Sequence, residues 1–167
     1  MKAILVLFSL VVAASAGCPP FWVQFRGQCY KYVNKPLTKL AASEYCSRYG
    51  SCDGELARLL SIESLQKDNY MHLLLSDYVM EPPTFPIWLG LTQDPQNQDL
   101  WMWESGNIID SQSNRPGYTN WANNQPGEAC ARTFPNEFGH TWREVPCDRE
   151  LRFVCEMPAG DELQPLF

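Results

Sequence analysis

Two stretches in the first half of the chain have apolar residues at the spacing of an α-helix. The first, residues 39–48, follows Thr38 as a suitable N-cap and stops at Gly50. The second begins after Ser64, another good N-cap, and ends before Pro82-Pro83. Its apolar positions, which would form one buried stripe, are Leu65, Tyr70, Leu73, Leu74 and Val79. The pattern therefore predicts two helices.

Short apolar runs rich in β-branched and aromatic residues predict strands elsewhere. Aromatic side chains alternate loosely around Gly27 in residues 21–32, which indicates a short hairpin. Further runs of this kind are residues 87–91, 100–103, 141–142 and 152–155. With the helices, these runs predict an α+β fold that contains small antiparallel sheets.

Residues 104–128 are dominated by Asn, Ser, Gln, Gly and Pro, with only isolated aromatic residues. A connection of this length without structure of its own is uncommon in a compact domain unless it has a function. We therefore expect a long irregular loop here and expect binding to be located in it.

The first residues have the pattern of a secretory leader. Lys2 supplies a positive start, residues 4–12 are apolar, and Ala14-Ser15-Ala16 is a small-x-small cleavage pattern, so residues 1–16 are interpreted as a signal peptide. The apolar run is shorter than the roughly 20 residues of a membrane crossing. We expect a secreted, extracellular protein without a membrane anchor, with one domain over residues 17–158 and a flexible tail over residues 159–167.

The chain carries a formal charge of −6, which becomes −7 when Lys2 leaves with the leader. No run of Lys or Arg offers a phosphate-binding stripe, which argues against nucleic acid and anionic membrane as partners. An acidic extracellular surface favours cations or mineral, although the charge could also serve only solubility. The seven cysteines of a secreted chain indicate disulfides, and an odd number leaves one cysteine over.

Taken in order, several motifs resemble the long-form C-type lectin domain. They are Trp88-Leu89-Gly90-Leu91, Trp101-Met102-Trp103-Glu104-Ser105-Gly106, Tyr118-Thr119-Asn120-Trp121, Gln125-Pro126-Gly127, Glu128-Ala129-Cys130, Trp142-Arg143-Glu144 and Phe153-Val154-Cys155-Glu156. The resemblance covers nearly the whole chain after the leader. Residues 46–61 and 154–160 are most similar to echinoderm lectins of the echinoidin kind and to the lectin-like domains of sea-urchin spicule-matrix proteins.

The resemblance implies a disulfide-stapled fold with three bridges: Cys18 with Cys29, Cys46 with Cys155, and Cys130 with Cys147. Cys52 is then left over, in a turn flanked by glycine and serine. It either remains free or joins two chains, and we favour a disulfide-linked dimer through Cys52.

The resemblance also implies a site in which one calcium ion and a sugar share ligands. Gln125 and Glu128 match that site, and Glu144 keeps the charge of an expected Asp. Gly127 has no side chain where Asn or Asp is expected, and Arg143 stands where Asn is expected. Calcium needs six to eight oxygen ligands. We therefore favour a degenerate loop over a galactose-type calcium site built by Gln125, Glu128 and Glu144, and no cofactor other than calcium is suggested.

Neighbouring positions shape this loop in either case. The loop between Pro126 and Cys130 is shorter than in the family, and Ala129 replaces a carboxylate associated with a second calcium ion. The family counterpart of Pro126 favours a cis peptide bond, which would shape the loop. Trp121 and Trp142 are interpreted as core supports beneath it rather than as platforms for sugar stacking.

Catalysis has little support in the sequence. Neither His72 nor His140 has a Ser, Cys or carboxylate at a suggestive spacing, so we expect no enzyme. Two functions remain. One is an acidic matrix protein of a calcium carbonate skeleton, with the lectin fold as scaffold and mineral as partner; the other is a calcium-dependent, galactose-type lectin that binds glycans. The Gly127 and Arg143 departures favour the first.

Overall fold

The computed structural model describes residues 17–51, 54–78, 85–110, 117–136 and 139–160. The expected leader, Cys52 and residues 161–167 of the expected tail lie outside these ranges. The expected dimer through Cys52 therefore stays a prediction.

Both predicted helices form where their caps predicted them. α1 (Lys39–Cys46) begins after Thr38, whose Oγ1 accepts a hydrogen bond from the Ala41 backbone N–H at 3.4 Å. α2 (Leu65–Tyr78) begins after Ser64, whose Oγ accepts one from the Lys67 N–H at 3.2 Å. The first helix ends at Cys46, slightly earlier than predicted.

The buried face of α2 differs from the predicted stripe. Leu65 and Leu73 are 59% and 62% exposed, whereas Met71, Leu74 and Leu75 are buried. Asp68 is also buried on this face, one turn before Met71. The prediction was right for Leu74 and for the partly buried Tyr70 but wrong for Leu65 and Leu73, because the buried face is centred on Met71 and Leu75 and includes a carboxylate. Val79 lies outside the described residues.

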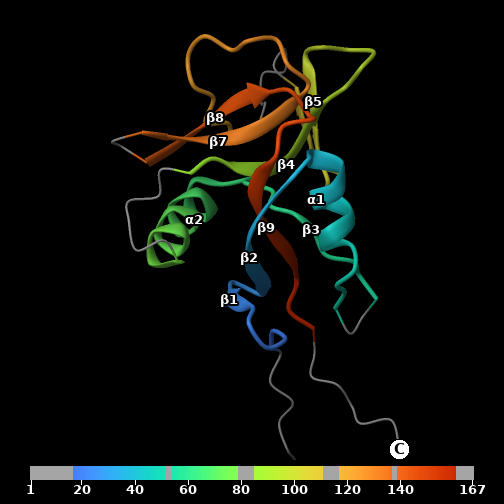
Figure 1. Ribbon diagram of the computed structural model, residues 1–167, viewed down its shortest axis with the longest axis vertical. Coiled ribbons are helices and arrows are strands. Elements are labelled where there is room, and N and C mark those ends of the chain that lie inside the picture. The colour runs from blue at the N-terminus through green and yellow to red at the C-terminus, as the bar shows by residue number, and fades with distance from the viewer. Residues whose placement is uncertain (1–16, 52–53, 79–84, 111–116, 137–138, 161–167) are drawn as a thin grey trace, which may run out of the picture.

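Within the described ranges, nine strands form one mixed sheet (Figure 1). Their bounds are β1 (Val23–Phe25), β2 (Gln28–Leu37), β3 (Arg58–Leu59), β4 (Ile87–Gln93), β5 (Leu100–Trp103), β6 (Ile108–Asp110), β7 (Cys130–Asn136), β8 (Gly139–Val145) and β9 (Leu151–Pro158). The hairpin β1–β2 and strands β4, β5, β8 and β9 occupy the predicted regions. β3, β6 and β7 were not predicted, and β6 interrupts the long loop expected over residues 104–128.

β9 organises the sheet. It pairs antiparallel with β2 and β3, and parallel with β4 through Ile87 opposite Arg152 and Trp88 opposite Phe153. Every other strand pair is antiparallel, as predicted. Figure 1 shows β2 and β9 side by side down the middle, with α2 and α1 flanking them and β7 and β8 above. The ends of the domain meet, because Gly17 N–H donates to Gly160 O at 3.1 Å.

The Trp-Leu-Gly-Leu motif lies where β4 passes closest to another backbone. A Cβ atom at Gly90 would lie 2.7 Å from the Leu59 carbonyl oxygen, and Gly90 N–H donates to Leu60 O at 2.7 Å. Only glycine permits this approach. Around it, Trp88, Leu89 and Leu91 are fully buried. Gly90 therefore lets the core strand pack directly against residues 59–60.

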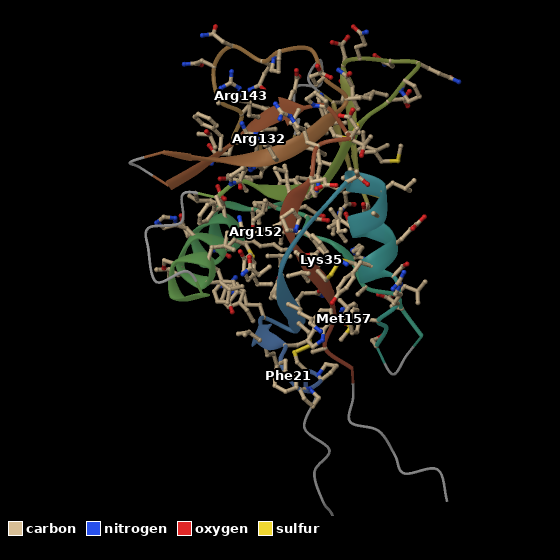
Figure 2. All side chains as sticks on the ribbon, viewed as in Figure 1. Phe21, Lys35, Arg132, Arg143, Arg152 and Met157 are labelled. Carbon is tan, nitrogen blue, oxygen red and sulfur yellow. A yellow bond between two sulfur atoms is a disulfide. The ribbon has the colours of Figure 1, made fainter. Side chains whose placement is uncertain are left out.

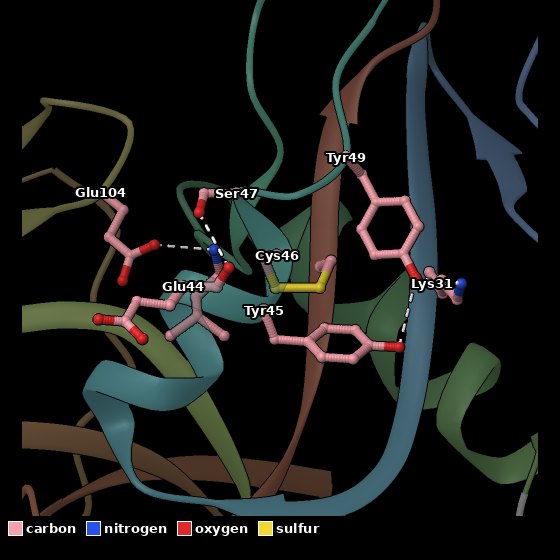
Figure 3. Close-up of a disulfide and its surroundings, with 9 residues drawn as sticks. Lys31, Glu44, Tyr45, Cys46, Ser47, Tyr49 and Glu104 are labelled. Atoms are coloured by element: carbon pink, nitrogen blue, oxygen red, sulfur yellow. Dashed lines mark hydrogen bonds between the residues drawn. A yellow bond between two sulfur atoms is a disulfide. The ribbon is translucent and has the colours of Figure 1, made fainter.

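The disulfides between described cysteines join the three pairs that the family resemblance implied. Cys18–Cys29 ties the N-terminal segment to β2, and Cys130–Cys147 ties β7 to the turn after β8. Cys46–Cys155 links α1 to β9 across 109 residues of sequence, with both cysteines fully buried (Figure 3). The last bridge fixes the helix to the central strand.

Three ion pairs among the described residues each include one buried side chain, Glu156 in two of them and Lys39 in the third. Glu156 on β9 is 1% exposed and lies 2.6 Å from Lys67 Nζ and 3.5 Å from Arg58 Nε. Burial raises the pKa of Glu156, although Lys67 and Arg58 act in the opposite direction. Lys39 Nζ lies 3.4 Å from Glu104 Oε1, while Glu104 Oε2 accepts the Leu59 N–H at 2.8 Å.

Neither described helix is long and apolar enough to cross a membrane.

Candidate functional site

The loop before β7 is anchored to β8 by backbone and aromatic contacts. Trp142 N–H donates to Asn120 O at 2.7 Å, and Ala122 N–H donates to Trp142 O at 2.8 Å. Trp142 is fully buried, and Trp121 packs against its ring edge-on at 5.6 Å between centroids. Both tryptophans belong to or pack against the core, as predicted. They support the loop from beneath.

The Gln125 side chain is used inside the loop. Its Nε2 donates to the carbonyl oxygens of Ala122 and Trp142, and its Oε1 accepts the Glu144 backbone N–H at 2.9 Å. The amide thereby joins the loop to β8 through both of its ends. The oxygen that could bind a ligand already accepts a hydrogen bond from the chain.

Glu144 on β8 makes further hydrogen bonds to the loop. Its Oε2 accepts the backbone N–H of Gly127 at 2.6 Å and that of Glu128 at 3.1 Å. Hydrogen bonds to a carboxylate are the stronger kind. Gly127 has φ of +83°, a left-handed conformation that glycine adopts without strain. Gly127 therefore has two effects. It offers no side chain as a ligand, and its backbone conformation lets two successive N–H groups reach Glu144.

The side chains of the other predicted site residues, Glu128, Pro126 and Arg143, do not take part in these hydrogen bonds. The carboxylate of Glu128 has no hydrogen-bond or ion-pair partner among the described residues. Pro126 is exposed, and the expected cis bond before it is not found, because the described residues contain no cis peptide. Arg143 packs its guanidinium over the Phe134 ring at 5.2 Å, on the face of β8 opposite to Glu144.

These side chains do not fit a calcium ion. The family site would need Gln125, Glu128, Glu144 and two further side chains, of which Gly127 has none and Arg143 is cationic. Two of the remaining oxygens, Gln125 Oε1 and Glu144 Oε2, accept backbone hydrogen bonds. Among the described residues, no three His, Cys, Asp or Glu side chains are arranged to hold a metal. The donors left fall short of the six to eight oxygens that calcium takes.

A second polar network was missed by the sequence analysis. The buried Asp68 on α2 accepts hydrogen bonds from Tyr118 OH at 2.6 Å and from Asn120 Nδ2 at 2.8 Å. Burial, followed by the bond to Asp68, raises the pKa of Tyr118 well above its usual value. The motif Tyr118-Thr119-Asn120-Trp121 was the available signal, since its polar residues needed a buried partner. This network holds the start of the loop against α2.

A cluster of arginines was also missed. Arg132 on β7 lies opposite Arg143 on β8, and Figure 2 shows both in the upper layer of the molecule. Their guanidinium carbons lie 5.3 Å and 5.2 Å from the centroid of the Phe134 ring. The sequence signal was present in the arginines at positions 132, 143 and 149, but the acidic net charge directed attention to the carboxylates.

Comparison with known proteins gives consistent matches over most of the chain. The model of the family described as "Lectin C-type domain" matches residues 35–157. Asialoglycoprotein receptor 2 of Mus musculus is 32% identical over 149 residues; the match covers 83% of this chain but only 42% of that protein. An alpha-N-acetylgalactosamine-specific lectin of Patiria pectinifera is 29% identical, with 84% and 82% of the two chains covered.

A solved structure has the same fold. Ovocleidin-17, described as a major protein of the Gallus gallus eggshell calcified layer, superposes with a TM-score of 0.68 at 24% identity. The superposition covers 86% of this chain and all of that one. At this level of identity the match shows the fold alone.

Proposed function

The chain belongs to the C-type lectin domain family, and on that premise we propose that it is a secreted, non-enzymatic matrix protein that adsorbs to calcium carbonate through its acidic surface. In this proposal the lectin fold is a stable scaffold. The loop that holds the sugar site in other members of the family serves to close the structure.

One observation carries the proposal. Two of the oxygens that the family site would give to calcium are used within the chain: Glu144 Oε2 accepts the N–H groups of Gly127 and Glu128, and Gln125 Oε1 accepts the Glu144 N–H. The hydrogen bonds to Glu144 stabilise the loop without a ligand, because two N–H groups that would otherwise need water have a charged acceptor. A calcium ion would compete with these bonds for the same oxygens and would find few further donors.

The distribution of charge supports adsorption over a wide surface. Exposed carboxylates are spread along the chain, on α1 and in three separate connections: Glu44, Glu55, Asp99, Asp148 and Glu150. With a net charge of −6 over the whole chain, many weak contacts to a mineral face are available. Ovocleidin-17, the eggshell protein with the same fold, is a precedent for such a setting.

Adsorption to calcite crystals tests the proposal. We expect binding that weakens steadily with added salt, because exposed charges are screened over roughly 10 Å at 0.1 M. Binding should survive Gln125→Ala and Glu128→Ala, and should weaken in the triple variant Glu44→Gln, Glu55→Gln, Asp148→Asn. The matched control changes three exposed uncharged residues, Gln96→Ala, Gln98→Ala and Asn123→Ala. No adsorption of the unaltered protein, or equal loss in both triple variants, would refute the mineral function.

The second candidate is a calcium-dependent lectin for galactose-type sugars. Gln125, which begins the loop triplet, and the alpha-N-acetylgalactosamine-specific lectin among the relatives favour it. A glycan array run with and without calcium separates the two functions. Calcium-dependent binding that free galactose inhibits and Glu128→Ala abolishes, without mineral adsorption, would make this candidate the correct one.

A further inference from the structure

Three arginines gather on one side of this acidic protein without acidic partners. Within the described residues, no carboxylate lies within 4.0 Å of the side-chain nitrogens of Arg132, Arg143 or Arg149. The register of β7 and β8 places Arg132 directly opposite Arg143, and like charges in that position destabilise a sheet. The arrangement therefore needs a source of compensation.

Two of these arginines, Arg132 and Arg149, border a cavity. It has a volume of about 420 Å³ and is lined by Pro86, Arg132, Val145, Arg149, Glu150 and Leu151. We refer to it as the arginine cavity. Its size falls within the range of about 300–1,000 Å³ that small-molecule sites occupy. Apolar walls with a few convergent charged groups are the usual composition of such a site.

The charges in this cavity act on one another. The pKa of Arg132 is lowered first by burial and then by the nearby charges of Arg143 and Arg149. Arg132 makes a hydrogen bond from Nη1 to the Thr133 carbonyl at 3.1 Å, which leaves most of its five donors available. Its guanidinium also lies over Phe134, as does that of Arg143, so the ring holds both side chains in place.

We propose that the arginine cavity binds an acidic sugar, with Arg132 and Arg149 holding its oxyanion and Arg143 adding positive potential beside the opening. The fork of a guanidinium matches the geometry of a carboxylate or a sulfate ester. The cavity is larger than a lone oxyanion requires, and the walls at Pro86, Val145 and Leu151 suit the apolar face of a sugar ring. Glu150 is placed to accept a hydrogen bond from a sugar hydroxyl.

This site differs from the degenerate calcium loop. Arg143 and Glu144 are successive residues of β8 and face opposite sides of it, so the loop and the arginine cavity lie on different faces. The proposal goes beyond mineral adsorption and does not depend on it. A protein that bound both mineral and acidic polysaccharide could hold them together in one matrix.

The experiment uses three labelled oligosaccharides that share one backbone: a neutral form, a sulfated form, and a form oxidised to uronic acids. Binding is followed by fluorescence anisotropy at 0.15 M salt. We expect at least one anionic form to bind and the neutral form not to bind; the tighter anionic form identifies sulfate or carboxylate as the ligand. Arg149→Gln and Arg132→Gln should each weaken binding roughly ten- to a hundredfold, as loss of hydrogen bonds to a charged group predicts.

The matched control is Arg48→Gln, which removes the same charge from an exposed position at the end of α1. It should change affinity by less than about twofold, since general attraction would be only slightly reduced. Arg149 is exposed, so its variant tests the site even if Arg132→Gln disturbs folding. Equal binding of the neutral form, no binding of either anionic form, or equal loss in Arg48→Gln and Arg149→Gln would overturn the proposal. Calcite adsorption measured on the same variants should be retained.

Discussion

The part of the molecule around α1, β2 and β9 differs from the part around β7, β8 and the preceding loop in what fixes the chain. In the first, a buried disulfide joins Cys46 to Cys155, and the buried Glu156 lies between Lys67 and Arg58. In the second, side chains hold the loop by hydrogen bonds to its backbone, above all Glu144 to Gly127 and Glu128.

In the function proposed above, this difference lets the fold be kept without a binding site in the loop. The disulfide and the ion pairs of the first region involve no ligand, so they stabilise the domain independently of the loop. In the second region the same residue types that would bind calcium satisfy the loop instead. Gly127 and Arg143 offer no ligand atoms there, and the Glu144 carboxylate and the Gln125 amide have backbone partners instead.

The largest effect should come from the bridge that clasps the first region. Cys46→Ala with Cys155→Ala opens a loop of 109 residues, for which the chain-entropy account gives a loss of about 5 kcal/mol in the free energy of unfolding. The comparison is Cys130→Ala with Cys147→Ala, whose separation of 17 gives about 3 kcal/mol. Urea unfolding of the two double variants measures both. A greater loss in the second variant would contradict the assigned roles.

A smaller effect should follow removal of the cation beside Glu156. Lys67→Met leaves a buried carboxylate without its nearest partner, which should cost about 3 kcal/mol at pH 7. The exposed Lys35→Met carries the same change in charge and should alter the free energy of unfolding by less than about 0.5 kcal/mol. Chemical unfolding at fixed pH gives both values.

The pH dependence of the Lys67→Met variant sharpens this test. Burial already raises the pKa of Glu156 above its ordinary value of 4.5, and removal of Lys67 should raise it further. The unfolded chain then loses this proton at a lower pH than the folded one, so the free energy of unfolding falls as pH rises above 4.5. The deficit of the variant should be small at pH 4 and largest near neutrality. A deficit independent of pH would show that packing, not charge, is responsible.

The smallest effect should come from the loop. Glu144→Gln weakens the charged acceptor for two backbone N–H groups, at a cost of about 1 kcal/mol because the carboxylate is only half-buried. Glu44→Gln is the control, an exposed carboxylate on α1. Hydrogen exchange at Gly127 and Glu128 should accelerate in the first variant alone. Unchanged exchange at these two amides would contradict the role of Glu144.

Local signals predicted the starts of the helices better than strand β7 or the buried face of α2. Thr38 and Ser64 predicted the helix starts because capping depends on a few neighbouring residues. β7 was missed because Arg132 and Pro135 interrupt its apolar pattern, and a proline argues against a central strand. The buried face of α2 was misjudged because Asp68 finds Tyr118 and Asn120 from a distant segment, which no local pattern contains.

The candidate site shows the same limit. The family resemblance identified Gln125, Glu128 and Glu144, and the absence of a side chain at Gly127 was evident from the sequence. The direction in which the Arg143 side chain points could not be predicted from the sequence, because it depends on which face of β8 each residue occupies. Nor could the sequence indicate that Glu144 would bind the loop backbone, since that follows from the positive φ of Gly127.

Calcium titration by calorimetry, with and without galactose, tests the central claim most directly. If Gln125 and Glu144 close the loop as described, the protein should show no single calcium site of micromolar affinity. Glu128→Ala should leave the titration unchanged, because its carboxylate belongs to no site. One calcium ion bound per chain at micromolar Kd, lost in Glu128→Ala and required for galactose binding, would show that the loop opens into a working lectin site.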